Sequence, residues 1–399
     1  MDAWVQQSAE QIAARAARDL EALVAVSSPS GDRHGAEDCV AVVRALAPPA
    51  ATVERIPCSS PGHADDVVVR LRGEGRGRLL LLGHLDTVVP HQRHASLRRE
   101  DERLTGSGTI DMKAGDVLAL GLLRALADAT AERRADAGGR RASGAAAGVA
   151  APSFAEVALL LVVDEEWRTG PMQHVERFAG WDGCLCFEAG ELAPDGSDAV
   201  IVRRKAAGTL SVHARGVASH AGAAPDRGRN ALLALAAAAQ IVAAAHAPDG
   251  PDRLTAVPTT LHSGDAFNVV PDDGELICDL RSDRTEAFEE VRASIPRELG
   301  GVVLDAQLAR VWPAMDSRAA TAPLLAAASE RLGRPLVAAG RGGASDASHV
   351  APAVPFTVDG LGPRGGRAHA PGEFVLEASL RPRAEVALAL AAAVLAAAD

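Results

Sequence analysis

The sequence predicts an α/β protein: a mainly parallel sheet with helices on both faces, and a second, smaller unit inserted into it. Three continuous apolar runs, at residues 78–83, 156–163 and 183–187, are typical of strands buried on both faces. Helical patterns separate strands along the chain, which favours a parallel sheet. Near residue 206 the pattern changes to β-α-β-β-α-β, which indicates a separate unit.

The segment before residue 128 carries the first elements of the expected sheet. Ser8 and Gln11 form a capping-box pattern, and the apolar periodicity around them predicts a helix that stops at the breakers of 27–31. A second helix is expected at 36–46, before two prolines. The remaining expected elements are strands at 51–56, 66–71 and 78–83, and a helix at 113–127.

Residues 129–153 are rich in Ala, Gly and Arg, and this low complexity predicts a flexible surface insertion. No function is assigned to it. The inserted unit is expected to hold strands at 208–216, 254–264, 274–282 and 301–311, with helices at 230–245 and 285–295. The predicted division is therefore a catalytic domain in two parts, 1–205 and 317–399, around a lid or dimerisation domain at 206–316.

Composition excludes several classes of protein. The 52 acidic and 41 basic residues leave a net charge of −11, which argues against partners that are nucleic acids or anionic membranes. The chain has no Tyr, so no mechanism can use a tyrosine hydroxyl. Five cysteines in a long chain imply no disulfide framework. The first residues do not form a signal peptide, and 384–398 is expected to be a packed helix, so a cytoplasmic protein is predicted.

Acidic and histidine side chains follow three of the expected strands. Parallel strands deliver the residues at their carboxyl ends to one edge of the sheet, where ligands bind in open α/β folds. Each motif alone is weak, but together they offer imidazole and carboxylate ligands suited to Zn²⁺, or to Mn²⁺ or Co²⁺. The residues at strand ends or in Gly-rich loops are His84, Asp86, Asp111, Asp164, Glu165, Glu166, Glu188 and His369.

Seven motifs in order resemble the co-catalytic zinc peptidase and deacylase family, which includes glutamate carboxypeptidase, acetylornithine deacetylase, succinyl-diaminopimelate desuccinylase and aminoacylase. The resemblance covers nearly the whole chain, and residues 219–232 are closest to the glutamate carboxypeptidase branch. The motifs are GHLDTVVP, GSGTIDMKAG, VVDEEW, CFEAG, VASHAGAAPDRGRNAL, GGASDASH and GPRGGRAHAPGEFV.

The resemblance implies a role for each residue of the set. His84 and Glu188 would bind one metal ion, Glu166 and His369 the other, and Asp111 would bridge the two. Asp86 would hydrogen-bond the second nitrogen of His84, which fixes its tautomer. His349 is the alternative to His369 as a metal ligand. His369 is favoured because its Gly-rich loop and the PGEFV after it match the family pattern.

The chemistry of two metal ions agrees with these roles. Two ions can polarise a carbonyl and lower the pKa of a water between them. Glu165 would then act as general base, beside the ligand Glu166. The oxyanion needs a donor; without tyrosine the candidates are a metal ion and a histidine, and the family implies His220, supplied by the partner subunit of a homodimer.

Recognition of a substrate carboxylate is expected from the inserted unit and a nearby loop. Asn268 and Arg281 match positions that hold this carboxylate in relatives, and the backbone of Gly343 and Ser345 offers N–H groups. A surface arginine is the alternative for Arg281. Trp312 stands where some carboxypeptidase relatives have a basic residue, which suggests a more apolar group nearby.

The expected function is a two-metal hydrolase that cleaves an amide next to a free carboxylate, in a small peptide or an N-acyl amino acid, with glutamate as one candidate. One alternative is a narrow biosynthetic deacylase of the acetylornithine or succinyl-diaminopimelate kind. Another is a non-catalytic dimeric homologue that only binds. Ala189 and Ala370 depart from the Pro and Ser of many relatives, but neither change removes a ligand.

Overall fold

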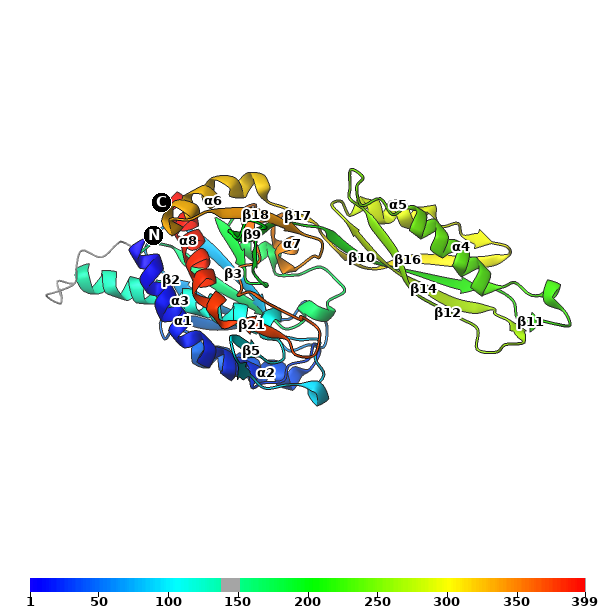
Figure 1. Cartoon of the computed structure of the whole chain (residues 1–399), viewed down its shortest axis with the longest axis horizontal. Helices are drawn as coiled ribbons and strands as arrows, with labels where there is room; N and C mark the ends of the chain where they lie inside the picture. Colours follow the sequence, from blue (N-terminus) through cyan, green and yellow to red (C-terminus); the bar gives the residue numbers. More distant parts are fainter. Residues whose placement is uncertain (138–150, 399) are drawn as a thin grey trace.

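The computed structural model describes residues 1–137 and 151–398. Figure 1 shows two lobes joined by long strands, with both termini in the larger lobe. The smaller lobe is the inserted unit, and the chain enters and leaves it through β10 and β16. The predicted α/β class with an inserted unit is confirmed, while the boundaries at 205/206 and 316/317 stay a prediction.

A six-stranded sheet forms the centre of the larger lobe. Its order is β1-β2-β6-β3-β7-β19. Strands β6, β3, β7 and β19 run parallel, whereas β2 is antiparallel to both of its neighbours. The strands are β1 Thr52–Ile56, β2 Asp66–Arg72, β3 Arg78–His84, β6 Glu156–Val162, β7 Gly183–Cys186 and β19 Thr357–Val358. The sheet is therefore mainly parallel, as predicted.

Alternate residues of the central strands face two different cores, because successive side chains of a strand point to opposite faces. Leu79 and Leu81 pack in a core with helices from both ends of the chain. Those helices are α1 Ala3–Val24, α2 Arg33–Leu46, α3 Ala114–Ala137, α6 Arg318–Leu332 and α8 Leu380–Ala398. Leu80 and Leu82 face a second core, which includes Val350 of the short helix α7 Asp346–Val350.

Two small sheets complete the larger lobe. The first contains β8 Glu191–Leu192, β9 Asp198–Arg204, β17 Met315–Asp316 and β18 Leu336–Arg341. The second has the order β20-β21-β5-β4, and its strands are β4 Arg98–Glu100, β5 Arg103–Thr105, β20 Gly365–Gly366 and β21 Phe374–Leu376. The second sheet brings the segment before α3 against the segment before α8.

The inserted unit has the predicted order of elements. They are β10 Ala206–Arg215, α4 Ala231–Ala244, β12 Thr255–Ser263, β14 Asp273–Ser282, α5 Glu286–Ser294 and β16 Val302–Trp312. With β15 Glu298–Leu299 the strands form an antiparallel sheet of order β12-β14-β10-β16-β15. Leu210, Leu235 and Phe288 belong to its own buried core. A two-stranded ribbon, β11 Ser219–His220 with β13 Val269–Val270, lies at the far tip of this lobe (Figure 1).

Two details of the predicted helices were wrong. The first helix begins at Ala3, where the carboxylate of Asp2 accepts the backbone N–H groups of Trp4 and Val5, so Ser8 lies inside the helix and caps nothing. Helix α3 continues to Ala137 instead of ending near 127, because residues 128–137 are mostly good helix formers. The rest of the predicted insertion, 138–150, lies outside the described residues.

The C-terminal helix is packed into the protein, as predicted. Most residues of α8 between Ala384 and Leu395 are buried. Among the described residues, no helix combines the length and apolarity needed to cross a membrane.

Candidate metal centre

Three parallel strands bring acidic and histidine residues to one edge of the sheet. His84 is the last residue of β3, and Glu188 follows β7 by two residues. Glu165 and Glu166 lie in the 3₁₀ turn Glu165–Trp167 that follows β6. Because β3, β6 and β7 are parallel, these side chains meet where the sequence predicts, at the carboxyl ends of the strands.

Asp111 reaches the same place from a turn before α3. The turn is fixed by Glu373, whose buried carboxylate accepts backbone N–H groups of Gly108, Ile110 and Asp111 at 2.9, 2.8 and 3.1 Å. Glu373 belongs to the PGEFV segment of the last motif, but the sequence analysis predicted no role for it. A contact between residues more than 260 positions apart leaves no local sequence signal.

The predicted ligands form two groups that share Asp111. In the first, His84 Nε2 lies 3.1 Å from Asp111 Oδ1 and 3.9 Å from Glu188 Oε1. In the second, His369 Nε2 lies 3.0 Å from Asp111 Oδ2 and 3.2 Å from Glu166 Oε2. Within each group the ligand atoms are within 4.8 Å of one another. The two oxygens of Asp111 thus face different groups.

The hydrogen bonds of His84 fit a cation beside its Nε2. Its Nδ1 lies 3.0 Å from the carbonyl oxygen of Asp86 and 3.4 Å from the Asp86 carboxylate. Both are acceptors, so Nδ1 carries the proton and Nε2 faces the carboxylates with its lone pair. Only a second proton or a metal ion can join Nε2 to Asp111.

The charges of the site fit cations as well. Burial, followed by the charge of Asp111, raises the pKa of Glu188 well above its usual value. Burial would lower the pKa of His84, but its hydrogen bonds to Asp111 and Asp86 raise it well above its usual value. Hydrogen bonds to Asp111 and Glu166 raise the pKa of His369 to about 10. The carboxylates that contribute to each of these shifts make the site a pocket of negative charge, which divalent cations would neutralise.

Glu166 provides a further test of this fit. Its Oε1 is buried and has no hydrogen-bond partner among the described residues, although Oε2 contacts His369. A buried carboxylate oxygen without a donor is costly unless a cation or water reaches it. The donor set therefore suits two divalent metal ions, and the absence of thiolates among the ligands is compatible with Zn²⁺, Mn²⁺ or Co²⁺.

Asp86 connects His84 to the acidic turn. Besides its contact with the imidazole, its carboxylate accepts the backbone N–H groups of Glu165 and Glu166, both at 3.1 Å. One side chain therefore orients ligands from two strands. Glu165 itself is not a member of either ligand group; burial, with the charges of Glu166 and Asp111, raises its pKa to about 7.

His349, the competitor of His369, lies in a different environment. It is buried in α7, with its ring centroid 4.8 Å from that of Trp312. Burial, with the charges of Arg168 and Arg310, lowers its pKa to about 3. The two arginines stack on the Trp312 ring, 4.9 and 4.3 Å from its centroid. The structure places His369, and not His349, beside the carboxylates.

His220 and Asn268 lie together, away from both ligand groups. They belong to the tip of the inserted unit, at β11 and before β13, and both are exposed. The backbone N–H of Ala221 donates to the carbonyl oxygen of Asn268 at 2.9 Å. Figure 1 shows this tip at the end of the small lobe opposite the sheet, so one chain alone does not bring these residues to the metal ligands.

The other predicted substrate residues already have partners. Arg281 forms an ion pair with Asp279 on the same strand, at 2.9 Å. The carbonyl oxygen of Gly343 accepts a hydrogen bond from Arg204. The hydroxyl of Ser345 is buried and donates to Asp359 at 2.6 Å. In this arrangement none of the three joins a metal-ligand group.

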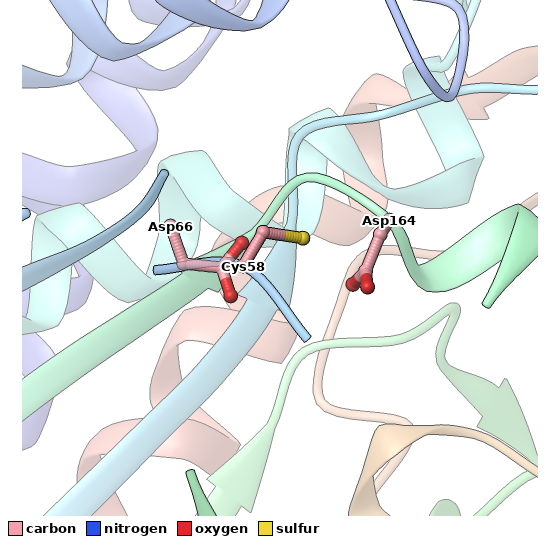
Figure 2. A group of neighbouring side chains, drawn as sticks. All are labelled: Cys58, Asp66 and Asp164. Atoms are coloured by element: carbon pink, nitrogen blue, oxygen red, sulfur yellow. The ribbon is translucent and has the colours of Figure 1, made fainter. Parts of the chain in front are cut away.

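A third cluster, which the sequence analysis missed, contains Cys58, Asp66 and Asp164. Their ligand atoms lie within 4.8 Å of one another, and in Figure 2 the sulfur lies between the two carboxylates. Asp66 already contacts His174 Nε2 at 2.8 Å, and Asp164 pairs with Arg168 at 2.7 Å. Burial, together with the charges of the two carboxylates, raises the pKa of Cys58 well above its usual value, so the side chain stays a protonated thiol. The cluster is best interpreted as an internal hydrogen-bond network behind the acidic turn.

Asp116 is another buried acid that sequence reasoning missed. A Cβ atom on Gly83 would lie 2.1 Å from its Oδ1, so the glycine before His84 leaves room for this carboxyl group. Neither of its oxygens has a hydrogen-bond partner among the described residues. Burial raises its pKa well above the usual value, which favours the neutral acid.

Comparison with known proteins agrees with the motifs. Residues 202–302 match the family model of the M20 peptidase dimerisation domain. Carboxypeptidase G2 of Pseudomonas sp. is 26% identical over 277 residues, which are 68% of this chain and 61% of that protein. This chain thus matches less than two thirds of the length of that relative. A putative succinyl-diaminopimelate desuccinylase of Mycobacterium tuberculosis is 41% identical over 68 residues, which are 17% of this chain and 19% of that protein.

Solved structures share the fold over nearly the whole chain. The aminopeptidase PepT of Bacillus cereus superimposes with a TM-score of 0.73 at 20% identity, over 96% of this chain and 98% of that one. The matched dimerisation domain, the two curated relatives and this common fold agree with the seven motifs. Together the domain match and the two curated relatives support the M20 family of peptidases and deacylases as the family that this chain resembles.

Proposed function

We propose that this protein is a metal-dependent hydrolase with two divalent ions, which cleaves an amide bond next to a free carboxylate. The observation that carries the proposal is the position of Asp111, with one oxygen 3.1 Å from His84 and the other 3.0 Å from His369. A carboxylate between two ligand groups suits a pair of ions that act together. His84 and Glu188 would hold one ion, and Glu166 and His369 the other.

Zinc is the proposed metal, with manganese or cobalt as alternatives. When bound, the two ions would polarise the scissile carbonyl and lower the pKa of a water molecule between them. Asp86 would keep His84 in the tautomer that leaves Nε2 free, because its carbonyl oxygen accepts from Nδ1. Asp111 would be held in place by the backbone hydrogen bonds of its turn to Glu373.

Glu165 is the proposed general base. A carboxylate oxygen of Glu165 takes a proton from water as the water oxygen bonds to the carbonyl carbon. The same oxygen returns the proton to the amide nitrogen as the carbon–nitrogen bond breaks, which releases an amine and a carboxylic acid that then ionises in water. Its pKa of about 7, raised first by burial, suits a group that must accept and donate a proton near neutral pH.

His220 is the proposed donor to the oxyanion, supplied by the second subunit of a homodimer. Its Nδ1 accepts backbone N–H groups of Gly222 and Ala223 at 3.1 and 3.0 Å. The proton of the neutral ring therefore lies on Nε2, which is exposed and can donate. The match of 202–302 to a dimerisation domain supports the dimer.

The proposed substrates are N-acyl amino acids or small peptides. The likeness to a carboxypeptidase supports a substrate that carries a free carboxylate. Asn268 and Arg281 would bind this carboxylate once the partner's tip or a movement of the inserted unit brings them to the site. The backbone of Gly343 and Ser345 would complete the pocket from the larger lobe. A cytoplasmic location stays a prediction of the sequence.

The test is hydrolysis of a panel of N-acetyl amino acids and dipeptides by the purified protein. Activity should vanish with a chelator and return with Zn²⁺, Mn²⁺ or Co²⁺. Replacement Glu165→Gln should lower kcat by about 10² to 10⁴, while the exposed control Glu176→Gln should not. Failure of every substrate with every metal, or full activity of Glu165→Gln, would contradict the proposal.

A further inference from the structure

A cavity of about 500 Å³ lies next to the second ligand group. Its walls come from residues 88–107, which follow the His84 motif, and from residues 369–373, which begin with His369. Its volume is within the range of small-molecule sites. Because His369 belongs both to the cavity wall and to the ligand group with Glu166, the cavity opens beside the proposed reaction centre.

The lining of the cavity is mostly apolar. Its aliphatic residues are Val88, Val89, Pro90, Ala95, Ala370 and Pro371. Among its charged side chains, Arg93, Arg98 and Glu100 are exposed. The carboxylate of Glu373 is buried and is hydrogen-bonded to the turn of Asp111. Apolar walls with exposed charges suit a group that is apolar along its length.

Hydrogen bonds hold both walls of the cavity. The backbone N–H of Ala95 donates to the hydroxyl of Ser107 at 2.9 Å, and Ser107 N–H donates back to the Ala95 carbonyl at 3.0 Å. Gly106 N–H donates to the carbonyl oxygen of Glu373 at 3.0 Å. His91 contacts Ser27 at 2.9 Å, which ties the 88–96 segment to the loop before α2. The cavity is therefore preformed, which lowers the entropic cost of binding.

The cavity and the proposed carboxylate site lie on different sides of the sheet edge. The strands β5 and β21 border the cavity, and Figure 1 shows them below β3. The helix α7 follows the loop of Gly343 and Ser345 and lies above β3 in the same view. A substrate cleaved between them must place its two halves on opposite sides of the ligand groups. The half that carries the carboxylate would lie toward α7, which leaves the other half for the cavity.

We infer that the 88–107/369–373 cavity binds the acyl group of the substrate, and that the preferred substrates are amino acids with a long aliphatic or aromatic N-acyl group. The inference rests on the proposed function and specifies its substrate class. Burial of one methylene is worth a factor of about four in kcat/KM at most. An N-octanoyl substrate has six methylenes more than an N-acetyl substrate. Its kcat/KM should therefore be far more than tenfold higher, even if the acyl chain is only partly buried.

The experiment compares N-acetyl, N-hexanoyl, N-octanoyl and N-benzoyl derivatives of one amino acid with the metal-loaded protein. The test variant Ala95→Trp fills the cavity. The matched control is Ala50→Trp, an exposed residue in the loop before β1, at the opposite end of the sheet. We expect kcat/KM to rise with chain length in the wild type and the control, and the octanoyl-to-acetyl ratio to fall at least about tenfold in Ala95→Trp.

The outcomes separate this inference from the proposed function. Hydrolysis of N-acetyl substrate with no gain along the series, or an unchanged octanoyl-to-acetyl ratio in Ala95→Trp, overturns the cavity assignment and leaves the hydrolase intact. If no substrate is cleaved, the proposed function fails, and calorimetry with the N-octanoyl amino acid decides the cavity. Binding that Ala95→Trp abolishes and Ala50→Trp keeps supports the assignment; no binding to the wild type overturns it.

Discussion

Replacement of Glu373 tests whether a single side chain holds the turn that carries Asp111. Its carboxylate accepts three backbone N–H groups, through Oε2 from Gly108 and through Oε1 from Ile110 and Asp111. The side chain is only 4% exposed. We predict that Glu373→Gln and Glu373→Ala both weaken the fold and the binding of metal, to different degrees.

The magnitudes follow from the number of bonds that each replacement removes. Glutamine keeps one carbonyl oxygen, which can still accept from Ile110 and Asp111, but its amide group faces the N–H of Gly108. One lost bond to a charged acceptor costs about 2 kcal/mol of unfolding free energy. Alanine loses all three and should cost roughly 3 to 6 kcal/mol. Since the turn carries Asp111, metal affinity should fall about 10- to 100-fold, as for other residues that orient a ligand.

The assay is denaturant unfolding of the metal-free protein, together with metal titration by competition with a chromophoric chelator. The matched control is Glu377→Gln, four residues along the chain, where the carboxylate pairs with the exposed Arg99. Loss of that pair should cost about 0 to 1 kcal/mol and should leave metal affinity unchanged. If Glu373→Gln behaves like Glu377→Gln in both measurements, Glu373 does not hold the turn.

Three further predictions concern protons and subunits. Because burial lowers the pKa of His349 to about 3, the free energy of unfolding should decrease as the pH falls from the unfolded pKa of 6.5 toward 3. In unfolding curves His349→Gln should remove at most about 5 kcal/mol of that loss. Burial raises the pKa of Asp116, so the free-energy cost of burying this residue is absent in acid and grows as the pH rises above the pKa of the unfolded chain. Asp116→Asn should therefore be more stable than wild type at neutral pH and equally stable in acid. His220→Ala and Glu165→Gln should each be inactive alone. When equal amounts are refolded together, half of the dimers should be mixed, and one of the two sites in each mixed dimer should be complete, so about a quarter of wild-type activity should return. No recovery despite mixed dimers would contradict a histidine from the partner.

The fold was predictable because its signals are local. Runs such as 78–83 show a strand buried on both faces, and the change of pattern near 206 marks the inserted unit. The ends of helices were less predictable. Asp2 caps α1 where Ser8 was expected to do so, because both are good capping residues and only the fold selects between them. Residues 129–137 belong to the segment interpreted as low complexity, yet their composition favours a helix.

That the proposed ligands lie together was predictable from strand ends and motif order, since each of these residues stands within its own motif. The residues that support them were not. Glu373 and Asp116 act through contacts with backbone or with a neighbouring glycine, and neither contact has a sequence pattern. Cys58 meets Asp164 only because β1, β2 and β6 are adjacent. Such contacts depend on the assembled sheet and not on the order of residues.

The two halves of the proposed centre differ in what supports them. His84 is buried at the end of β3, and Glu188, with its side chain 14% exposed, lies two residues beyond β7. His369 stands in a loop with its side chain 53% exposed.

That loop is linked to the turn of Asp111 through Glu373, and residues 369–373 of the loop form one wall of the cavity. Substitutions in this wall will therefore couple directly to His369 and, through Glu373, to Asp111, which both ligand groups share. Ala95 is the better probe of acyl binding for this reason, because it lines the cavity from the 88–107 wall and not from the segment that carries His369. A change in chain-length preference at Ala95 then reports on the cavity and not on a displaced ligand.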